Sequence, residues 1–134
     1  MVLVGLLQLI SLFSWAQLFI PGNGVTDIDG NHYSSIIINN QEWLSENLKT
    51  THYANGDTIP YVATAFDWQN SVSGSFTYYD NDTQTVSDVG LYYNGYAVID
   101  QRNVCPQGWK VPSRSDWVSL FLFLDANTDT AFNA

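Results

Sequence analysis

Residues 105–117 read Cys-Pro-Gln-Gly-Trp-Lys-Val-Pro-Ser-Arg-Ser-Asp-Trp, and this stretch decides how the rest of the chain is interpreted. Ser113 and Asp116 have the spacing of a helix capping box, in which the hydroxyl accepts a first-turn amide and the acid lies near the positive helix end. Pro112 fixes the entry of the chain into this cap. The large apolar residues that follow repeat at helical spacing and form one face: Trp117, Leu120, Phe121 and Leu124. The segment therefore predicts a helix whose apolar face needs a partner surface, because each large side chain contributes about 1.5–3 kcal/mol when buried.

Short strands joined by tight turns are predicted before this helix. Turn signals stand at Asp29-Gly30, Asn39-Asn40 and Asn55-Gly56. The expected extended segments are residues 25–28, 32–38, 41–44, 50–53, 58–62 and 75–79. The remaining segments are a helical turn at residues 66–68, a polar loop at 80–88, and a short helix or strand at 90–98. This order predicts an α+β fold of short antiparallel strands and hairpins with one or two helices.

The first sixteen residues have the pattern of an export signal. They are uncharged and apolar, and they are shorter than the roughly 20 residues that span a bilayer. Ser14 and Ala16 are the small residues expected at a signal-peptidase site. A basic residue normally precedes such a core, so we expect the natural start to lie upstream of Met1. The alternative is a buried N-terminal helix or strand. Residues 17–24 then have the Pro-, Gly- and Asn-rich composition of a linker.

Composition excludes several classes of protein. The chain has 134 residues, with 13 Asp and Glu against 4 Lys and Arg, so its formal charge of −9 opposes binding to nucleic acid. The hydrophobic content of 46% is too high for a disordered chain. Together with the export signal, this acidic and folded composition predicts an extracellular or cell-envelope protein with no transmembrane span in the mature chain.

Metal-binding patterns are weak. Residues 27–31 (Asp-Ile-Asp-Gly-Asn) resemble the start of a calcium loop, but the positions that require Gly and Glu hold His32 and Ile38. A plain hairpin turn is the favoured interpretation. The only histidines, His32 and His52, set no ligand spacing and are predicted to lie on the surface. No metal and no cofactor are therefore predicted.

Cys105 is the only cysteine, so the chain by itself cannot form an internal disulfide or a cysteine-based metal cluster. It has no neighbouring histidine in sequence to activate it as a nucleophile. Its flanks, Val104 and Pro106, indicate a buried or disulfide-bonded thiol. In an exported protein an odd cysteine requires a partner, either on another chain or beyond residue 134. No acid, base and nucleophile converge in the sequence, so a non-catalytic protein is predicted.

The aromatic residues, 15% of the chain, are the best candidates for ligand binding. Adjacent residues of a strand face opposite ways, so one member of each Tyr-Tyr pair can point outward. Exposed rings beside Asn and Asp suit the recognition of sugars or peptides. The candidates are Trp43, Trp68, Tyr78, Tyr79 and Tyr92. The alternative, favoured for any single residue, is a small aromatic-rich core.

Five segments in this order resemble the Fibrobacter succinogenes major paralogous domain, a module of secreted and surface proteins. They are residues 25–33, 41–50, 53–60, 91–98 and 105–117, and the resemblance covers about residues 25–125. The last segment is the most specific, and structural roles are expected for Cys105, Pro106, Gly108, Trp109, Pro112, Ser113, Asp116 and Trp117. The family continues past this helix to a late cysteine. The resemblance therefore implies that residues 25–134 are the N-terminal part of a domain and that the mate of Cys105 lies further on.

Residues 111–117 are also similar to the helix entry of formylglycine-generating and related C-type-lectin-like folds. This likeness implies a lectin-like core. The copper-binding cysteine pair of the generating enzymes has no counterpart here, because only Cys105 exists. No catalytic residue is therefore carried over.

The favoured function is a non-catalytic extracellular module that binds carbohydrate or a surface protein. A structural or adhesive spacer with no small ligand is the alternative. An enzyme ranks last, since no catalytic set appears.

Overall fold

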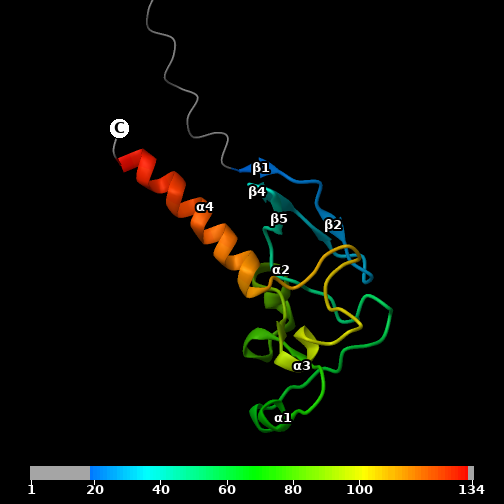
Figure 1. Cartoon of the computed structure of the whole chain (residues 1–134). Coiled ribbons are helices and arrows are strands. Elements are labelled where there is room, and N and C mark those ends of the chain that lie inside the picture. The colour runs from blue at the N-terminus through cyan, green and yellow to red at the C-terminus, as the bar shows by residue number, and fades with distance from the viewer. Residues whose placement is uncertain (1–18, 133–134) are drawn as a thin grey trace, which may run out of the picture.

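The computed structural model describes residues 19–132 of the chain (Figure 1). The predicted export signal at residues 1–16 lies outside the described residues. The strands are β1 (Ile20–Pro21), β2 (Val25–Thr26), β3 (His32–Tyr33), β4 (Ser35–Ile38), β5 (Gln41–Leu44), β6 (Phe76–Thr77) and β7 (Tyr92–Tyr93). The helices are α1 (Ala65–Asn70), α2 (Val86–Val89), α3 (Gly95–Val98) and α4 (Arg114–Phe132), with 3-10 turns η1 (Tyr79–Asn81) and η2 (Thr83–Thr85). The predicted α+β class is confirmed.

The largest sheet has three antiparallel strands in the order β1-β4-β5. β5 coincides with the strand predicted at residues 41–44, and it pairs with β4 from Ser35↔Leu44 to Ile38↔Gln41. The turn between them has Asn39 at a φ of 55°, a left-handed conformation that Asn tolerates. Two residues of the segment expected as a linker, Ile20 and Pro21, form β1 against Ile37 and Ile36.

The prediction of one strand over residues 32–38 was wrong, because the chain changes sheets at Ser34. β3 pairs with β2, whereas β4 pairs with β1 and β5. The Ser34 amide donates to the Glu46 carboxylate at 3.0 Å, and the Tyr33 hydroxyl donates to Asp27 at 2.6 Å. Both contacts lie where the chain leaves the first sheet pair and enters the second, and the Ser34 contact reaches Glu46, 12 positions later.

The Asp27 side chain stabilises the predicted hairpin turn at Asp29-Gly30. One of its oxygens accepts the Asp29 and Asn31 amides, both at 2.9 Å, and the other accepts the Asn31 side chain and the Tyr33 hydroxyl. Gly30 has a φ of 85°, which only glycine adopts readily. The buried carboxylate therefore has four donors from its own hairpin.

The second half of the chain is more helical than predicted. The expected helical turn at residues 66–68 is α1, which Thr64 caps by accepting the Asp67 amide. The prediction of a polar loop at residues 80–88 was wrong, since this segment includes most of η1, all of η2 and the start of α2. Asp82 starts η2 by accepting the Gln84 amide at 2.9 Å. Residues 90–98 supply both a strand, β7, and a helix, α3.

The core lies among the segments between the first sheet and α4. Its buried members are spread along the chain from residue 53 to residue 105: Tyr53, Ile59, Phe76, Leu91, Ala97, Val104 and Cys105. Trp109 and Val111 pack against this cluster as the chain approaches α4. The core therefore depends on loops and short elements rather than on one large sheet.

The long helix α4 begins at the predicted capping box. The Asp116 amide donates to the Ser113 hydroxyl at 3.3 Å, and the Ser113 amide donates to the Asp116 carboxylate at 2.7 Å. Lys110, which lies 2.8 Å from the same carboxylate, and Ser113 hold the pKa of Asp116 well below its usual range.

The apolar face of α4 is partly covered near the start of the helix. Trp117 contacts Trp43 of β5, with ring centroids 4.8 Å apart, and Leu120 is buried. Phe121, one turn beyond Trp117, is exposed. Figure 1 shows α4 running past β5 and β1 and continuing beyond the rest of the fold. Within residues 19–132, no helix has the length and apolar character needed to cross a membrane.

Candidate functional site

The five aromatic residues predicted to bind a ligand do not form one surface. Trp43 packs against Trp117 at the junction of β5 and α4. Trp68 lies half-buried on α1, and Tyr78 packs against the core. Only Tyr79 and Tyr92 meet each other on the surface.

Tyr79 and Tyr92 form an exposed pair. Their ring centroids are 6.2 Å apart, the ring planes are inclined by 33°, and the residues are 49% and 48% exposed. Tyr92 lies on β7 opposite Thr77 of β6, and Tyr79 follows two residues after Thr77. The neighbouring Tyr93 points inward, where its hydroxyl donates to the Thr50 carbonyl at 2.6 Å. Strand alternation predicted that one ring of each Tyr-Tyr pair can point outward, and in this pair the outward ring is Tyr92.

Tyr61, which the sequence analysis missed, brings a polar group to the neighbouring turn. Its hydroxyl donates to the Asn81 side chain at 3.3 Å, and its ring lies 4.9 Å from that of Tyr78. Asn81 has a φ of 56°, a left-handed conformation that Asn adopts more readily than most residues. No local pattern marks Tyr61, because its contacts are with residues 15 to 20 positions later.

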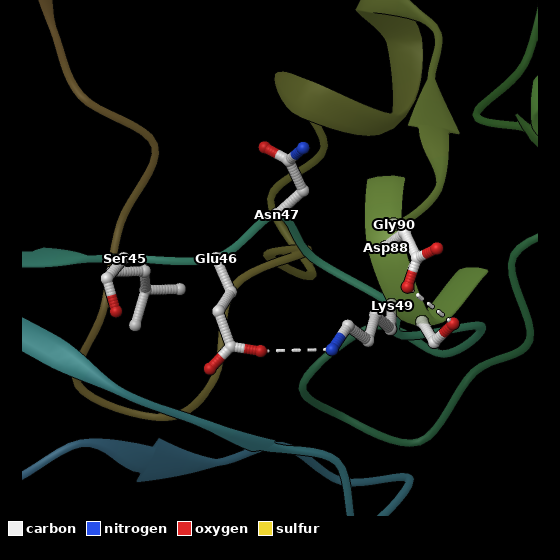
Figure 2. A pocket seen from close by; sticks show the side chains of 8 residues that line it. Ser45, Glu46, Asn47, Lys49, Asp88 and Gly90 are labelled. Carbon is white, nitrogen blue, oxygen red and sulfur yellow. Dashed lines mark hydrogen bonds and ion pairs between the residues drawn. The ribbon is translucent and has the colours of Figure 1, made fainter. Parts of the chain in front are cut away.

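A polar pocket of about 270 Å³ lies between the loop after β5 and the end of α2 (Figure 2). Its lining residues are Leu44, Ser45, Glu46, Asn47, Lys49, Ser87, Asp88 and Gly90. The Lys49 ammonium lies 3.0 Å from the Glu46 carboxylate. The Ser34 amide and Lys49 lower the pKa of Glu46. The sequence analysis missed this pocket, because no pattern indicates that residues 45–49 and 87–90 face each other.

A second cavity, of about 230 Å³, brings His52 and Cys105 to one lining. His52 Nδ1 contacts the Asp29 carboxylate, which also accepts the Thr51 amide and hydroxyl. Burial acts to raise the pKa of Asp29, but the bonds from Thr51 and His52 lower it overall.

Cys105 and His52 do not form an activated nucleophile in this arrangement. No hydrogen bond joins the two side chains in the part of the chain that the structure describes. Burial raises the pKa of the Cys105 thiol to about 11, so the thiol is protonated at neutral pH. The cavity therefore holds a buried thiol beside an Asp–His pair, without a thiolate.

Comparison with known proteins identifies the family. The model of the Fibrobacter succinogenes major domain matches residues 36–133, well over half of the chain. The chain belongs to this family. No curated protein and no solved structure matches the chain. The matched region of this major domain begins in β4 and includes both the tyrosine pair and the polar pocket, whereas Asp29 and the β2–β3 hairpin precede it.

The family-like segment at residues 105–117 forms a turn followed by the helix entry of the major domain. Cys105 and Pro106 are buried, and the Trp109 amide donates to the Pro106 carbonyl at 2.9 Å. Gly108 has a φ of 84° within this turn, and the Asn103 side chain donates to the Trp109 carbonyl. This geometry places the segment against the core, immediately before the cap of α4.

The described part of this major domain contains no cluster of potential metal ligands. Within residues 19–132, no group of three or more His, Cys, Asp and Glu residues is placed to hold a metal ion. His32 lies on the surface and contacts the Thr26 hydroxyl at 3.2 Å, whereas His52 contacts Asp29.

Proposed function

We propose that this Fibrobacter succinogenes major domain is a non-catalytic, exported module that binds carbohydrate through Tyr79 and Tyr92. The observation that carries the proposal is the pairing of two half-exposed rings at 6.2 Å on the β6–β7 side of the domain. Tyrosine offers an apolar face to a sugar ring and a hydroxyl at its edge. The inclination of 33° gives the two rings a shallow, aromatic surface of this kind.

Two features of the sequence support an extracellular or cell-envelope location. Residues 1–16 have the composition of an export signal, and residues 111–117 are similar to the helix entry of C-type-lectin-like folds. We include in this proposal that the domain has a C-type-lectin-like core. The non-catalytic role is supported by the protonated state of the Cys105 thiol and by the full engagement of Asp27 in its hairpin.

The proposal is tested by glycan-array screening of the protein, followed by calorimetric titration of the best glycan. Replacement of Tyr79 or Tyr92 by Ala is expected to lower the affinity about tenfold, since an aromatic contact contributes about 0.5–1.5 kcal/mol beyond area burial. Tyr96→Ala is the matched control, because Tyr96 is also 49% exposed but lies on α3, away from the pair. An equal loss of affinity in the control, or no glycan bound, contradicts the proposal.

Docking of a surface protein is the second candidate, favoured by apolar residues around a hollow of about 510 Å³. Val72 and Ile99, which line it, are 81% and 77% exposed. Tyr96 and Arg102 lie on the same hollow, and both residue types are enriched in protein interfaces. If no glycan binds and the protein associates with itself, the adhesive-spacer alternative gains support instead.

A further inference from the structure

Contacts between two segments of the chain hold the walls of the polar pocket in Figure 2 together. The Asn47 side chain donates to the Val89 carbonyl at 3.0 Å, and the Leu91 amide donates to the Leu48 carbonyl at 2.8 Å. Gly90 has a φ of 70°, and a Cβ there would lie only 2.6 Å from the Asn47 Cβ. The segment at residues 47–48 is therefore joined to the segment at residues 89–91 beside the hollow by hydrogen bonds within the protein.

The charges in this pocket are unbalanced. Glu46 and Lys49 neutralise each other as an ion pair. Asp88, on the other wall, accepts only the hydroxyl of its neighbour Ser87, at 3.0 Å, among the contacts within residues 19–132. At neutral pH the pocket carries one excess negative charge, in a chain whose formal charge is −9. A ligand with one positive charge would balance Asp88.

The remaining lining groups suit hydroxyl groups. Ser45, Ser87 and Asn47 are polar residues of the lining, and Lys49 uses one of its three N–H donors on Glu46. Leu44 is the only large apolar residue of the lining. The volume of about 270 Å³ lies just below the usual range for drug-sized ligands, which favours a small molecule.

We propose that this pocket binds a small hydroxylated primary amine, an amino sugar, with its ammonium group on Asp88. Its hydroxyl groups bind the Ser45, Asn47 and Ser87 side chains and the free donors of Lys49. The site is separate from the Tyr79–Tyr92 pair and does not require it. The tyrosine substitutions therefore test one site and Asp88 substitutions test the other.

The test is calorimetric titration of the full chain with glucosamine, glucose and N-acetylglucosamine at neutral pH and low salt. Glucosamine is expected to bind at least tenfold more tightly than either neutral sugar, because a hydrogen bond to a charged group is the strongest contact offered. Equal affinity for the three sugars overturns the proposal, and so does the absence of glucosamine binding. High sodium chloride should weaken glucosamine binding and leave neutral-sugar binding unchanged.

Asp88→Asn is expected to lower the affinity for glucosamine about tenfold or more. Asp82→Asn is the matched control, because it removes the same charge outside the pocket and keeps an oxygen to accept the Gln84 amide. A circular-dichroism melt of each variant verifies folding. Unchanged affinity in Asp88→Asn, or an equal loss in Asp82→Asn, would overturn the assignment of Asp88.

Discussion

Arg102 makes three different contacts with one planar group. Its guanidinium carbon lies 4.0 Å above the Tyr53 ring centroid, and its nitrogens bind both oxygens of Asp100, at 2.9 and 2.8 Å. A third contact reaches Asp57 at 3.2 Å. Stacking on a ring while binding a carboxylate in a fork is specific to arginine and is not reproduced by lysine. These bonds lower the pKa of Asp100 to about 2.

Arg102→Lys is therefore expected to lower the melting temperature and to raise the pKa of Asp100 toward its ordinary value of 3.8. Because the folded pKa is the lower one, Asp100 stabilises the fold above about pH 4 and loses this contribution as the pH falls toward 2. The variant should lose less stability over this acid range than the wild type. NMR titration and melts at each pH measure both effects. Lys110→Arg is the control, and an unchanged pKa of Asp100 in Arg102→Lys contradicts the argument.

The Tyr53 hydroxyl is buried and has no hydrogen-bond partner among residues 19–132. Tyr53→Phe should therefore leave the free energy of unfolding unchanged or raise it, since it removes an unsatisfied polar group. A Cβ on Gly74 would overlap this hydroxyl and lie 3.0 Å from the Ala97 Cα. Gly74→Ala is expected to destabilise the domain by about 1–3 kcal/mol.

The Gly74→Ala/Tyr53→Phe double variant should recover part of that loss in urea unfolding, so its loss of stability should be smaller than the sum of the two single effects. Simple addition of the two single effects would show that the hydroxyl is not the obstacle.

The capping box of α4 is the element most completely predicted from the sequence. Its residues are three apart, so no distant contact is needed to form it. Ser113→Ala removes the hydroxyl that the Asp116 amide binds, and should cost about 1 kcal/mol of stability in urea unfolding. Ser115→Ala is a suitable control, because within residues 19–132 the Ser115 side chain contacts the Ser113 hydroxyl and accepts no first-turn amide. A loss in the control as large as that in Ser113→Ala would contradict the capping argument.

Elements whose ends depend on distant residues were predicted less well. The pattern at residues 32–38 gave one strand, but the contact between Ser34 and Glu46 divides it. The polar composition of residues 80–88 predicted a loop, but Asp82 caps the helical turn η2 within it. The sequence also could not reveal the polar pocket, since its walls are joined by a contact between Asn47 and Val89, 42 positions apart.

At the scale of the whole molecule, the α+β class and the family could be predicted from local patterns, and the candidate site only in part. Strand alternation indicated that one tyrosine of each adjacent pair can point outward, but it could not show that Tyr79 lies beside Tyr92. Trp43 carries the same local pattern and instead packs on Trp117, which is 74 positions later. Which aromatic rings meet is decided by the packing of the complete chain.

The acidity of the chain predicts its response to salt. Three of the four basic residues, Lys49, Arg102 and Lys110, already pair with acids, and the 13 acidic residues still leave a formal charge of −9. Sodium chloride screens the repulsion between like charges over about 10 Å at 0.1 M. The melting temperature at neutral pH should therefore rise with salt. A fall would show that the ion pairs outweigh the repulsion.

The contact between Trp43 and Trp117 gives the molecule an optical signature. Two indole rings 4.8 Å apart and inclined by 48° couple their electronic transitions, so their absorption bands split into a pair of opposite circular-dichroism signs. The couplet depends on α4 resting against β5, because it arises from the two indole rings and not from the amide groups of the helix. Loss of this circular-dichroism couplet would therefore report the separation of α4 from β5 even if α4 itself stays helical.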